Sequence, residues 1–329
     1  MLRGAANPAP EMIDVSIIIP TYNRLWALPK AVASCSTQGC TVEVIVVDDG
    51  STDGTWEWLQ GRKDVVSIRR DNWGKDWAVV AGMARATGEY VRFLDSDDWL
   101  KPQANLEQLV QARETEADVV VAGYEDYHED SDRLEPHPWV DCDDFVAQQF
   151  GEVPFSHYSA FLFRRSFIED IPHRQEFALR DDRMFILEVA IRKPRVAVYR
   201  QPAFVHRHHN RGRLQRTSGL RRTLADWTNV EVYRKAVTLL AERGELSARR
   251  KRAAVSYVWP VVRNLAKTEL DEASAAAKWI FELDPGFVPP VRKSVSVAYR
   301  VLGFKTTERL LRIRALLCGK SPRGRDDRS

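Results

Sequence analysis

The sequence predicts an α/β fold with a mostly parallel, Rossmann-like sheet that is flanked by helices and followed by a helical C-terminal region. Short apolar segments rich in β-branched residues alternate with segments of helical periodicity up to about residue 220. From Arg222 onward the periodicity is helical throughout. With 329 residues, of which 44% are hydrophobic and 29% charged, the composition is typical of a globular protein with more than one substructure.

Four segments of the first hundred residues are predicted strands, because nearly uninterrupted apolar character is typical of strands buried on both faces. They cover residues 15–20, 42–48, 65–70 and 90–95. Helices are expected between them at residues 25–36, 52–60 and 75–86. Ser51 or Asp53 is the expected cap of the second helix, and Gly88 follows the end of the third. This alternation predicts that the strands run parallel.

The later elements are spaced more widely along the chain. Pro102 suits the first position of a helix that runs to about Glu116, since proline lacks the N–H that this position leaves unbonded. Residues 125–157 are expected to be irregular apart from a short helix at 144–150. Further strands are expected at 118–124, 158–163 and 196–200, and further helices at 180–193, 222–243, 247–268, 271–283 and 291–317.

Charge and cysteine content exclude several classes of protein. The net charge is 49 − 46 = +3, but the residues from Val291 to the end carry 11 basic and 3 acidic side chains, so this tail is +8 and the remainder −5. The four cysteines, Cys35, Cys40, Cys142 and Cys318, are too scattered for a disulfide framework or a zinc site. No segment has the character of a signal peptide or a membrane-spanning helix. We expect a cytoplasmic protein, and no nucleic-acid partner is predicted.

Three acids follow the fourth predicted strand, in the segment FLDSDDW at residues 93–99. Asp95 and Asp97 are two positions apart, and side chains at that spacing leave an extended segment on the same side. Their carboxylates are the hard oxygen ligands that Mg²⁺ or Mn²⁺ takes, and a cation relieves the repulsion between them. The alternative is a solvated turn in which Asp97 or Asp98 caps the next helix. Because the segment follows a buried strand, we predict a cation site.

Two other loops end at the same predicted edge of the sheet, where ligands of doubly wound sheets bind. After the first strand, Pro20 ends the apolar run, and Tyr22 can stack on a planar base while Thr21 or Asn23 bonds its edge. A tight turn between strand and helix is the alternative. After the second strand, Asp49 can accept a hydrogen bond from a base N–H. The residues that follow Asp49 are also typical of a turn and a helix cap.

Four segments together resemble the family 2 glycosyltransferases of the GT-A type in order and spacing. They are IIIPTYNR, VVDDGSTDGT, ATGEYVRFLDSDD and the acidic pair in RDDRMF, and the resemblance covers roughly residues 14–215. It implies an inverting enzyme that moves a sugar from a nucleotide diphosphate sugar, by default UDP-linked. The implied acceptor is a hydroxyl of a glycan, lipid-linked or cell-envelope molecule.

Residue patterns and the resemblance together predict four regions. Residues 1–13 are expected to be a disordered lead, and residues 14–105 are the nucleotide-sugar-binding half of the GT-A domain that the resemblance implies. Residues 106–220 are its acceptor-binding half, and residues 221–329 are a helical C-terminal region. We expect the nucleotide-binding residues to be Pro20, Thr21, Tyr22, Asn23, Arg24, Asp49, Lys75, Asp95 and Ser96, of which the resemblance itself implies Pro20, Tyr22, Asn23 and Asp49.

The resemblance assigns the metal and the catalytic base to particular carboxylates. Asp97 is the expected direct ligand of Mn²⁺ or Mg²⁺, with Asp95 beside it. The family's base lies in a Glu-Asp pair at the start of a helix, and here Asp181 stands where Glu is usual and Asp182 where Asp is usual. We expect Asp182, next to Asp181, to take the proton of the attacking hydroxyl. The alternative is that both are acids favoured at a helix N-terminus by its dipole.

The segment HRHHNRGRLQRTSGLRR, residues 206–222, carries three His and six Arg and no acid. Many relatives have a basic segment here that closes over the diphosphate, sometimes with a His that completes the metal site. His206 or His208 is the candidate because the two alternate along a strand end, and His208 is the expected ligand. A solvated basic loop or a contact with an anionic acceptor is the alternative.

The sequence departs from the family in one respect that concerns the donor. Many relatives have an Arg-Asn pair before the glycine that corresponds to Gly82, whereas this chain has Val79-Val80. Lys75 or the segment 206–222 must then supply the donor contact. The chain also has no QxxRW motif, which argues against a processive polysaccharide synthase.

Two other functions compete with glycosyl transfer. One is a non-catalytic module that binds a nucleotide or a glycan, which the Val79-Val80 departure supports. The other is a nucleotidyl or polyol-phosphate transferase on a similar sheet. That enzyme needs a glycine-rich or lysine-bearing phosphate loop after the first strand, where this chain has PTYNR.

The stretch 291–317 mixes apolar side chains with Arg and Lys, and such a helix can lie on an anionic membrane surface. This is consistent with a lipid-linked acceptor and a peripheral location at the inner face of the membrane. A helix packed on the body of the protein, or an interface of a homo-oligomer, is the alternative.

Overall fold

The structure, a computed structural model, describes residues 12–211 and 219–317. Most of the predicted lead at 1–13 therefore lies outside the described residues. The chain divides into two compact units, one formed by residues 1–149 and 153–213 and the other by residues 150–152 and 214–329.

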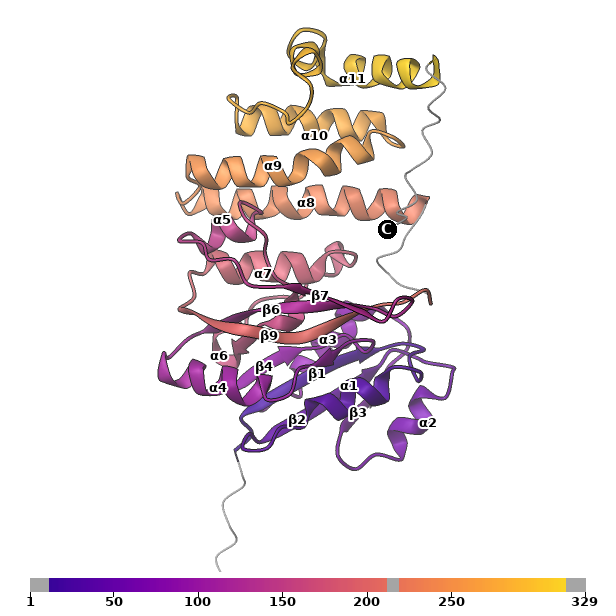
Figure 1. The fold of residues 1–329 in the computed structure, drawn as a ribbon, viewed down its shortest axis with the longest axis vertical. Helices are drawn as coiled ribbons and strands as arrows, with labels where there is room; N and C mark the ends of the chain where they lie inside the picture. Colours follow the sequence, from indigo (N-terminus) through magenta and orange to yellow (C-terminus); the bar gives the residue numbers. More distant parts are fainter. Residues whose placement is uncertain (1–11, 212–218, 318–329) are drawn as a thin grey trace, which may run out of the picture. The chain divides into compact units, whose positions relative to one another are not determined.

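The first unit is built on a mixed sheet whose N-terminal part is parallel, as predicted (Figure 1). Its first four strands are β1 (Val15–Thr21), β2 (Val42–Asp48), β3 (Val66–Arg69) and β4 (Tyr90–Phe93). They lie in the order β3-β2-β1-β4 and pair in parallel. The predicted fold class is confirmed, and the order places β1 in the middle of the parallel part.

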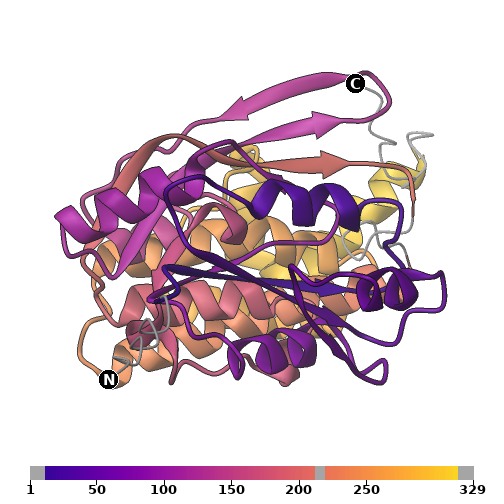
Figure 2. The same ribbon diagram turned by 90° about the horizontal axis from the view of Figure 1, so that it is seen from below.

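The remaining strands extend the sheet and bring in antiparallel pairs. They are β5 (Trp99–Leu100), β6 (Val119–His128), β7 (Arg133–His137), β8 (Leu162–Arg164) and β9 (Val196–His208). The order continues from β4 through β8, β6 and β9 to β5, while β7 pairs with the free part of β6. Strands β6 and β9 are parallel, whereas β8 runs antiparallel to both β4 and β6. Figure 2 shows the long β6–β7 hairpin with β9 beside it.

The helices of the first unit cover both faces of this sheet. They are α1 (Leu28–Cys35), α2 (Thr55–Gln60), α3 (Lys75–Met83), α4 (Ala104–Glu114), α5 (Phe145–Gln149), α6 (Arg165–Ile168) and α7 (Asp181–Ile191), with 3₁₀ turns at Tyr158–Ala160 and Gln175–Phe177. The predicted helices correspond to α1, α2, α3, α4, α5 and α7, and each predicted range is a few residues longer than the observed helix.

Several local predictions about caps and strand bounds were wrong. Helix α2 is capped by Gly54, at φ 90°, and not by Ser51 or Asp53. Pro102 precedes the cap of α4, which is Gln103 at φ 64°. The region predicted to be irregular contains β7, whose charged and proline residues hide the strand pattern. Residues 158–163 begin as a 3₁₀ turn before β8.

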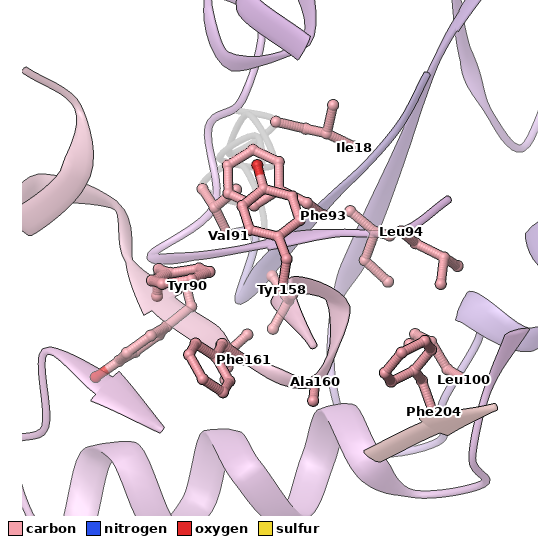
Figure 3. Close-up of a cluster of buried hydrophobic side chains, with 14 of the residues drawn as sticks. Ile18, Tyr90, Val91, Phe93, Leu94, Leu100, Tyr158, Ala160, Phe161 and Phe204 are labelled. Atoms are coloured by element: carbon pink, nitrogen blue, oxygen red, sulfur yellow. The ribbon is translucent and has the colours of Figure 1, made fainter. Parts of the chain in front are cut away.

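An aromatic and aliphatic core fills the space beneath β4 (Figure 3). The rings of Phe93 and Tyr158 are stacked, with centroids 4.6 Å apart, and Phe163 and Phe185 pack around Phe93. All four side chains are buried. This core supports the end of β4, from which the acidic loop departs.

Arg92 is a buried cation in the middle of β4. Its guanidinium donates to the carbonyl oxygen of Ser159, at 3.1 Å, and to the side-chain oxygen of Gln108. Burial lowers the pKa of Arg92 to about 10. These neutral acceptors connect β4 to α4 and to the 3₁₀ turn, so they anchor the strand that leads into the acidic loop.

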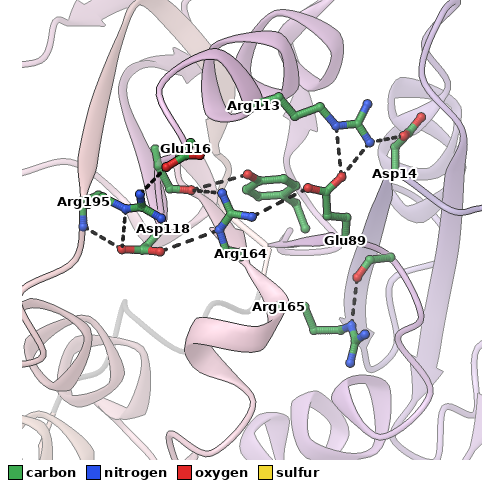
Figure 4. Close-up of polar contacts among 11 residues, drawn as sticks. Asp14, Glu89, Arg113, Glu116, Asp118, Arg164, Arg165 and Arg195 are labelled. Carbon is green, nitrogen blue, oxygen red and sulfur yellow. Dashed lines mark hydrogen bonds and ion pairs between the residues drawn. The ribbon is translucent and has the colours of Figure 1, made fainter.

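Charged residues at the amino ends of the strands form an ion network at the edge opposite the acidic loop (Figure 4). Arg113 contacts Asp14, which precedes β1, and Glu89, which precedes β4. Arg164 contacts Glu89 and also Asp118, which precedes β6. Exposed pairs of this kind contribute little individually. The network marks this edge as the structural end of the sheet.

The second unit consists of helices α8 (Leu220–Glu242), α9 (Ala248–Leu265), α10 (Leu270–Leu283) and α11 (Lys293–Leu317), close to the four predicted ranges. Trp259 of α9 is buried, and the rings of Phe287 and Tyr299 pack edge-on against it. Helix α11 is interrupted at Gly303, where φ is 75°. Within the described ranges, no helix is long and apolar enough to cross a membrane.

Candidate functional site

The loops that follow β1 and β2 are fastened to each other at the carboxyl edge of the sheet. Asn23, in a left-handed conformation at φ 52°, accepts a hydrogen bond from the backbone N–H of Thr52 at 2.8 Å. Its own N–H donates to the hydroxyl of Ser51 at 2.8 Å. Asparagine tolerates this conformation better than most residues. The contacts give Asn23 a structural role in shaping the edge.

The other residues of the PTYNR segment differ in their accessibility. Pro20 and Thr21 are the last residues of β1, and the hydroxyl of Thr21 is buried with no hydrogen-bond partner in residues 12–211 or 219–317. Tyr22 is 43% exposed, so its ring is open to a ligand. Arg24 reaches toward the acidic loop, with its Nε 3.8 Å from Oδ2 of Asp97.

Both carboxylate oxygens of Asp49 accept hydrogen bonds from the loop that leads into α3. The donors are the backbone N–H groups of Trp73, at 3.0 Å, and Gly74, at 2.8 Å. Asp49 is almost fully buried. It therefore holds the loops after β2 and β3 together, and a base N–H would have to share an oxygen that already has one donor.

The acidic loop leaves the sheet as a tight turn and not as an extension of β4. The strand ends at Phe93, and the N–H of Asp98 donates to the carbonyl of Asp95 at 3.0 Å. The extended geometry that was expected for Asp95 and Asp97 is thus incorrect. The turn instead gives each of the three carboxylates a different partner.

Asp95 is paired with the lysine that begins α3. Nζ of Lys75 lies 2.5 Å from Oδ1 of Asp95. Burial disfavours the charged form of Lys75, but the carboxylates of Asp95, Asp182 and Asp97 outweigh it and raise the pKa of Lys75 above its usual value. For Asp95, the ammonium outweighs burial and lowers the pKa. Lys75 is therefore a fixed positive charge among these acids.

Asp97 is paired with a histidine from the far end of the domain. Oδ2 of Asp97 lies 2.9 Å from Nε2 of His209, and the imidazole is fully buried. The ring of Trp26 packs edge-on against His209, with centroids 4.7 Å apart. Ser96, between the two acids, is also buried. A carboxylate and an imidazole are thereby brought together at the acidic loop.

Asp98 is the buried member of the acidic loop. Its Oδ1 accepts a hydrogen bond from the backbone N–H of Arg207 in β9 at 2.8 Å, and its Oδ2 has no hydrogen-bond partner among the described residues. Burial, followed by the charges of Asp97 and Asp95, raises the pKa of Asp98 well above its usual value despite the opposing effect of His206. Asp98 thus fastens the acidic loop to β9.

The acidic pair at the start of α7 consists of one anchored and one accessible carboxylate. Oδ2 of Asp181 lies 2.6 Å from Nδ1 of His173, and its Oδ1 accepts from the N–H of Arg174 at 2.5 Å. Asp182 is half-buried, and its Oδ1 accepts from the N–H of Arg183 at 2.8 Å. Asp182 also lies within the electrostatic reach of Lys75. Asp181 is therefore buried and held by two partners, whereas Asp182 is the more accessible of the two carboxylates.

Asp76 is a site residue that the sequence analysis missed. It follows Lys75 in the first turn of α3 and is buried. Burial, followed by the charge of Asp181, raises the pKa of Asp76 to about 7. The sequence signal was its place beside Lys75 on a predicted helix start, but only the fold brings α3 and α7 close enough for the acids to interact.

The histidines of β9 do not lie where they were expected. His208, the predicted metal ligand, has its Nε2 2.8 Å from Oδ1 of Asp126 in β6. Nδ1 of His206 lies 2.8 Å from the same oxygen. The imidazole at the acidic loop belongs to His209, which follows the strand. The basic segment at 212–218 lies outside the described residues.

Comparison with known proteins shows what this chain is similar to. Residues 16–172 match the model of the family described as glycosyl transferase family 2. A "Putative glycosyltransferase EpsH" of Bacillus subtilis is 27% identical over 265 residues, which is 73% of each chain. An "Undecaprenyl-phosphate 4-deoxy-4-formamido-L-arabinose transferase" of Pseudomonas paraeruginosa is 31% identical over 173 residues, or 49% of this chain and 50% of that one.

Solved structures of similar fold include residues 1–349 of TarS from S. aureus. That structure superposes with a TM-score of 0.63 at 16% identity and covers 94% of this chain and 93% of the other. A complex of the same TarS fragment with UDP-GlcNAc gives a TM-score of 0.58 at 15% identity. At this level of identity the likeness supports the GT-A fold.

Proposed function

The chain belongs to glycosyltransferase family 2, and we propose that it transfers a sugar with inversion from a UDP-sugar to a hydroxyl of an acceptor. One observation carries the proposal. The ammonium of Lys75 contacts the carboxylate of Asp95 and interacts electrostatically with the carboxylates of Asp182 and Asp97. A base and an anion-binding group are thus gathered at the edge of the sheet where ligands of such folds bind.

Asp182 is the proposed general base. Both oxygens of Asp181 already have partners in His173 and Arg174, so Asp181 is better suited to positioning the start of α7. Among the described residues, the carboxylate of Asp182 accepts a single hydrogen bond, from the backbone N–H of Arg183. Its carboxylate can therefore accept the acceptor's proton as the oxygen bonds to the anomeric carbon and the bond to the diphosphate breaks.

Asp97, Asp95 and His209 are the proposed ligands of a divalent cation, Mn²⁺ or Mg²⁺. Two carboxylates and an imidazole fit Mn²⁺ well, since the hard oxygens suit Mg²⁺ and Mn²⁺ and the imidazole favours the transition metal. The contact of His209 with Asp97 supports this assignment over the one expected for His208. A bound cation supplies positive charge that stabilises the departing diphosphate.

The donor is proposed to lie along the loops after β1 and β2. Tyr22 is exposed and can stack on the base, while Thr21 offers a buried hydroxyl. Asp49 shapes the pocket through its two backbone contacts and has lone pairs left for a base N–H. Further donor contacts are proposed for Pro20, Asn23, Arg24, Lys75, Asp95 and Ser96.

The acceptor is proposed to be a lipid-linked or cell-envelope molecule at a membrane surface. After its break at Gly303, helix α11 exposes the apolar side chains of Ile313 and Leu316 together with the basic Arg309 and Arg312. That combination suits a helix lying on an anionic bilayer. The relative from Pseudomonas paraeruginosa carries undecaprenyl-phosphate in its name, and that molecule belongs to the same chemical class of acceptor.

The proposed donor is tested by incubating the protein with UDP-, GDP- and dTDP-sugars and Mn²⁺, with free nucleotide as the readout. Slow release of UDP from one UDP-sugar, dependent on the cation, is the expected result. Tight UDP binding without turnover, with or without acceptor, would favour a non-catalytic binding module. Release of UMP together with transfer or release of a sugar phosphate, in place of UDP, would indicate a nucleotidyl or polyol-phosphate transferase, because such an enzyme breaks the bond between the two phosphates.

A further inference from the structure

Most of the histidines of the chain gather on one face of the sheet, in a group that does not include His209, the histidine that contacts Asp97. Of the seven histidines, five have rings that contact one another or the carboxylate of Asp126. They are His128, His137, His157, His206 and His208. The strands that carry most of them, β6, β7 and β9, lie side by side in both ribbon views (Figures 1 and 2).

Strand register produces this cluster. Asp126 in the central strand β6 is directly opposite His206 in β9. On the other side of β6, Tyr124 is opposite His137 in β7, so Asp126 and His137 project from the same face of the sheet. Within β9, His206 and His208 are two positions apart and share that face as well. The carboxylate of Asp126 is therefore flanked by imidazoles from both neighbouring strands.

The distances within the cluster are those of a ligand set. Oδ1 of Asp126 lies 2.8 Å from Nδ1 of His206 and 2.8 Å from Nε2 of His208. One ligand atom from each of the three residues lies within 4.8 Å of the other two. In a tetrahedral zinc site with bonds of about 2.0–2.2 Å, the ligand atoms are separated by roughly 3.3 Å. The two distances of 2.8 Å between Oδ1 of Asp126 and the imidazole nitrogens need to increase by only about half an ångström to reach that value.

We propose that Asp126, His206 and His208 bind a divalent transition-metal ion of the zinc class, at a site separate from Asp95 and Asp97. Imidazole suits Zn²⁺ and its neighbours in the transition series, whereas Mg²⁺ prefers oxygen ligands throughout. Two imidazoles and one carboxylate are also a common zinc ligand set, in which a water or a fourth side chain completes the tetrahedron.

The groups around the three ligands have the arrangement expected of a second shell. Nε2 of His137 lies 2.9 Å from Oδ2 of Asp126, whereas His206 and His208 contact Oδ1. At its present angle, Nε2 of His137 makes no hydrogen bond within the described residues. A small rotation of this ring would align the two, and such a bond would hold the carboxylate in place. Partners of this kind orient metal ligands and tune their basicity.

Two further rings fix the ligand imidazoles. His128 is stacked on His208, with centroids 4.7 Å apart, and His157 is stacked on His206, with centroids 5.1 Å apart. The ligand side chains are between 12% and 27% exposed, which leaves a path by which an ion can enter.

A hydrogen-bonded cluster without a metal is the competing account. It would require the imidazoles beside Asp126 to donate to one oxygen, which fixes both tautomers or charges one ring. The proposed ion removes that requirement, because both rings can then be neutral and offer lone pairs. The two accounts differ in what they predict for zinc, for thermal stability and for the coordination spectrum.

The proposed ion would fix the end of β9 against β6. His209 follows His208 directly and contacts Asp97, so the position of β9 determines where that imidazole lies. The ion is thus a structural one, and the proposal does not rest on glycosyl transfer. It predicts metal binding even in a protein with no activity.

The experiment measures zinc in the full-length chain after treatment with a chelator and dialysis. Mass spectrometry of the metal and titration calorimetry with Zn²⁺ should give about one tightly bound ion per chain, and the melting temperature should rise on adding it. X-ray absorption of the zinc form should show two imidazole nitrogens with oxygen ligands. Asp126→Asn and His208→Gln should each weaken zinc binding by at least about 10- to 100-fold.

Two variants serve as controls. Asp132→Asn neutralises an exposed carboxylate of the same hairpin and should leave zinc binding unchanged. Asp132 has a φ of 50°, and Asn adopts this left-handed conformation as readily as Asp. Asp97→Asn should also retain the zinc, because it removes a ligand of the other proposed site only. Circular dichroism of each metal-free variant establishes that it is folded.

Three results would overturn the proposal. The first is a wild-type chain that takes up no zinc at micromolar concentration. The second is equal zinc affinity in the wild type and in folded Asp126→Asn or His208→Gln. The third is loss of the zinc in Asp97→Asn, which would assign the ion to the acidic loop. If a ligand variant fails to fold, a spectrum of the wild-type zinc form without imidazole ligands overturns it equally.

Discussion

Nε2 of His209 lies 2.9 Å from Oδ2 of Asp97, although the two residues are 112 positions apart. Asp97 is in the turn after β4, and His209 follows the last residue of β9. The hydrogen bond from Arg207 to Asp98 holds the same two segments together at 2.8 Å. The acidic loop and the end of β9 therefore form one structural feature, on which the proposed cation site depends.

Replacing His209 by Gln should raise the Mn²⁺ concentration needed for half-maximal transfer by about tenfold or more, because a ligand of the cation is lost. The measurement is a Mn²⁺ titration of UDP release. His128→Gln is the matched control, since His128 contacts His208 and not the acidic loop. Equal Mn²⁺ dependence in both variants would mean that His209 is not a ligand.

Replacing Asp76 by Asn should stabilise the protein more at pH 8.5 than at pH 5. Burial raises the pKa of Asp76 from 3.8 to about 7, so the folded state prefers the protonated acid. The stability that this group provides is fully present below its unfolded pKa and is lost as the pH rises through about 7. The loss is at most about 4 kcal/mol, at 1.36 kcal/mol for each unit.

The measurement for Asp76 is thermal or urea unfolding of the wild type and Asp76→Asn at both pH values. Asp71→Asn, an exposed acid in the loop before α3, is the control and should change neither curve. A stabilisation by Asp76→Asn that is larger at pH 5 than at pH 8.5 would contradict the raised pKa.

Replacing Gly82 by Ala should destabilise the fold by about 1–3 kcal/mol. A Cβ at Gly82 would meet Cγ2 of Ile18 at 2.4 Å, because α3 packs closely on β1 at this point. Gly61→Ala is the control, since its Cβ would make only an ordinary contact at 3.5 Å. Denaturant unfolding measures both, and equal free energies of unfolding would show that α3 can move away from β1.

The protein should bind vesicles that contain phosphatidylglycerol, and binding should fall as salt is added, because basic residues near an anionic surface contribute about 1 kcal/mol each. Ile313→Asp combined with Leu316→Asp should abolish it by placing charges among the apolar side chains of α11. Val110→Asp is the control, since this exposed apolar residue lies on α4. Sedimentation with the vesicles is the measurement, and equal binding by all three proteins would remove α11 from this role.

The arrangement of strands and helices was predictable where periodicity was clear. Strand β2 was predicted with its observed bounds, because every residue from Val44 to Val47 is apolar and buried. The hairpin strand β7 was not, since its residues Arg133 and Glu135 are charged and only pairing with β6 makes them a strand. Helix caps at Gly54 and Gln103 depend on backbone conformations with positive φ, which the local sequence does not specify uniquely.

The acids of the site were recognisable in the sequence, but their partners were not. Asp95, Asp97 and Asp182 stand in loops or at a helix start, where motifs and spacing identify them. The pairing of Lys75 with Asp95, and of His209 with Asp97, joins segments that are distant in the chain and depends on the sheet order. Alternation along β9 correctly placed His206 and His208 on one face of the strand, but on that face both imidazoles contact Asp126 and not the acidic loop.

The central claim is that a carboxylate at the start of α7 accepts the proton while the loops after β1, β2 and β4 bind the donor. The most direct test is the rate of sugar transfer by Asp182→Asn, measured together with UDP affinity by calorimetry. The account predicts a rate reduced by about 10²- to 10⁴-fold with UDP affinity within a few-fold of the wild type. Transfer at the wild-type rate by this variant would contradict it.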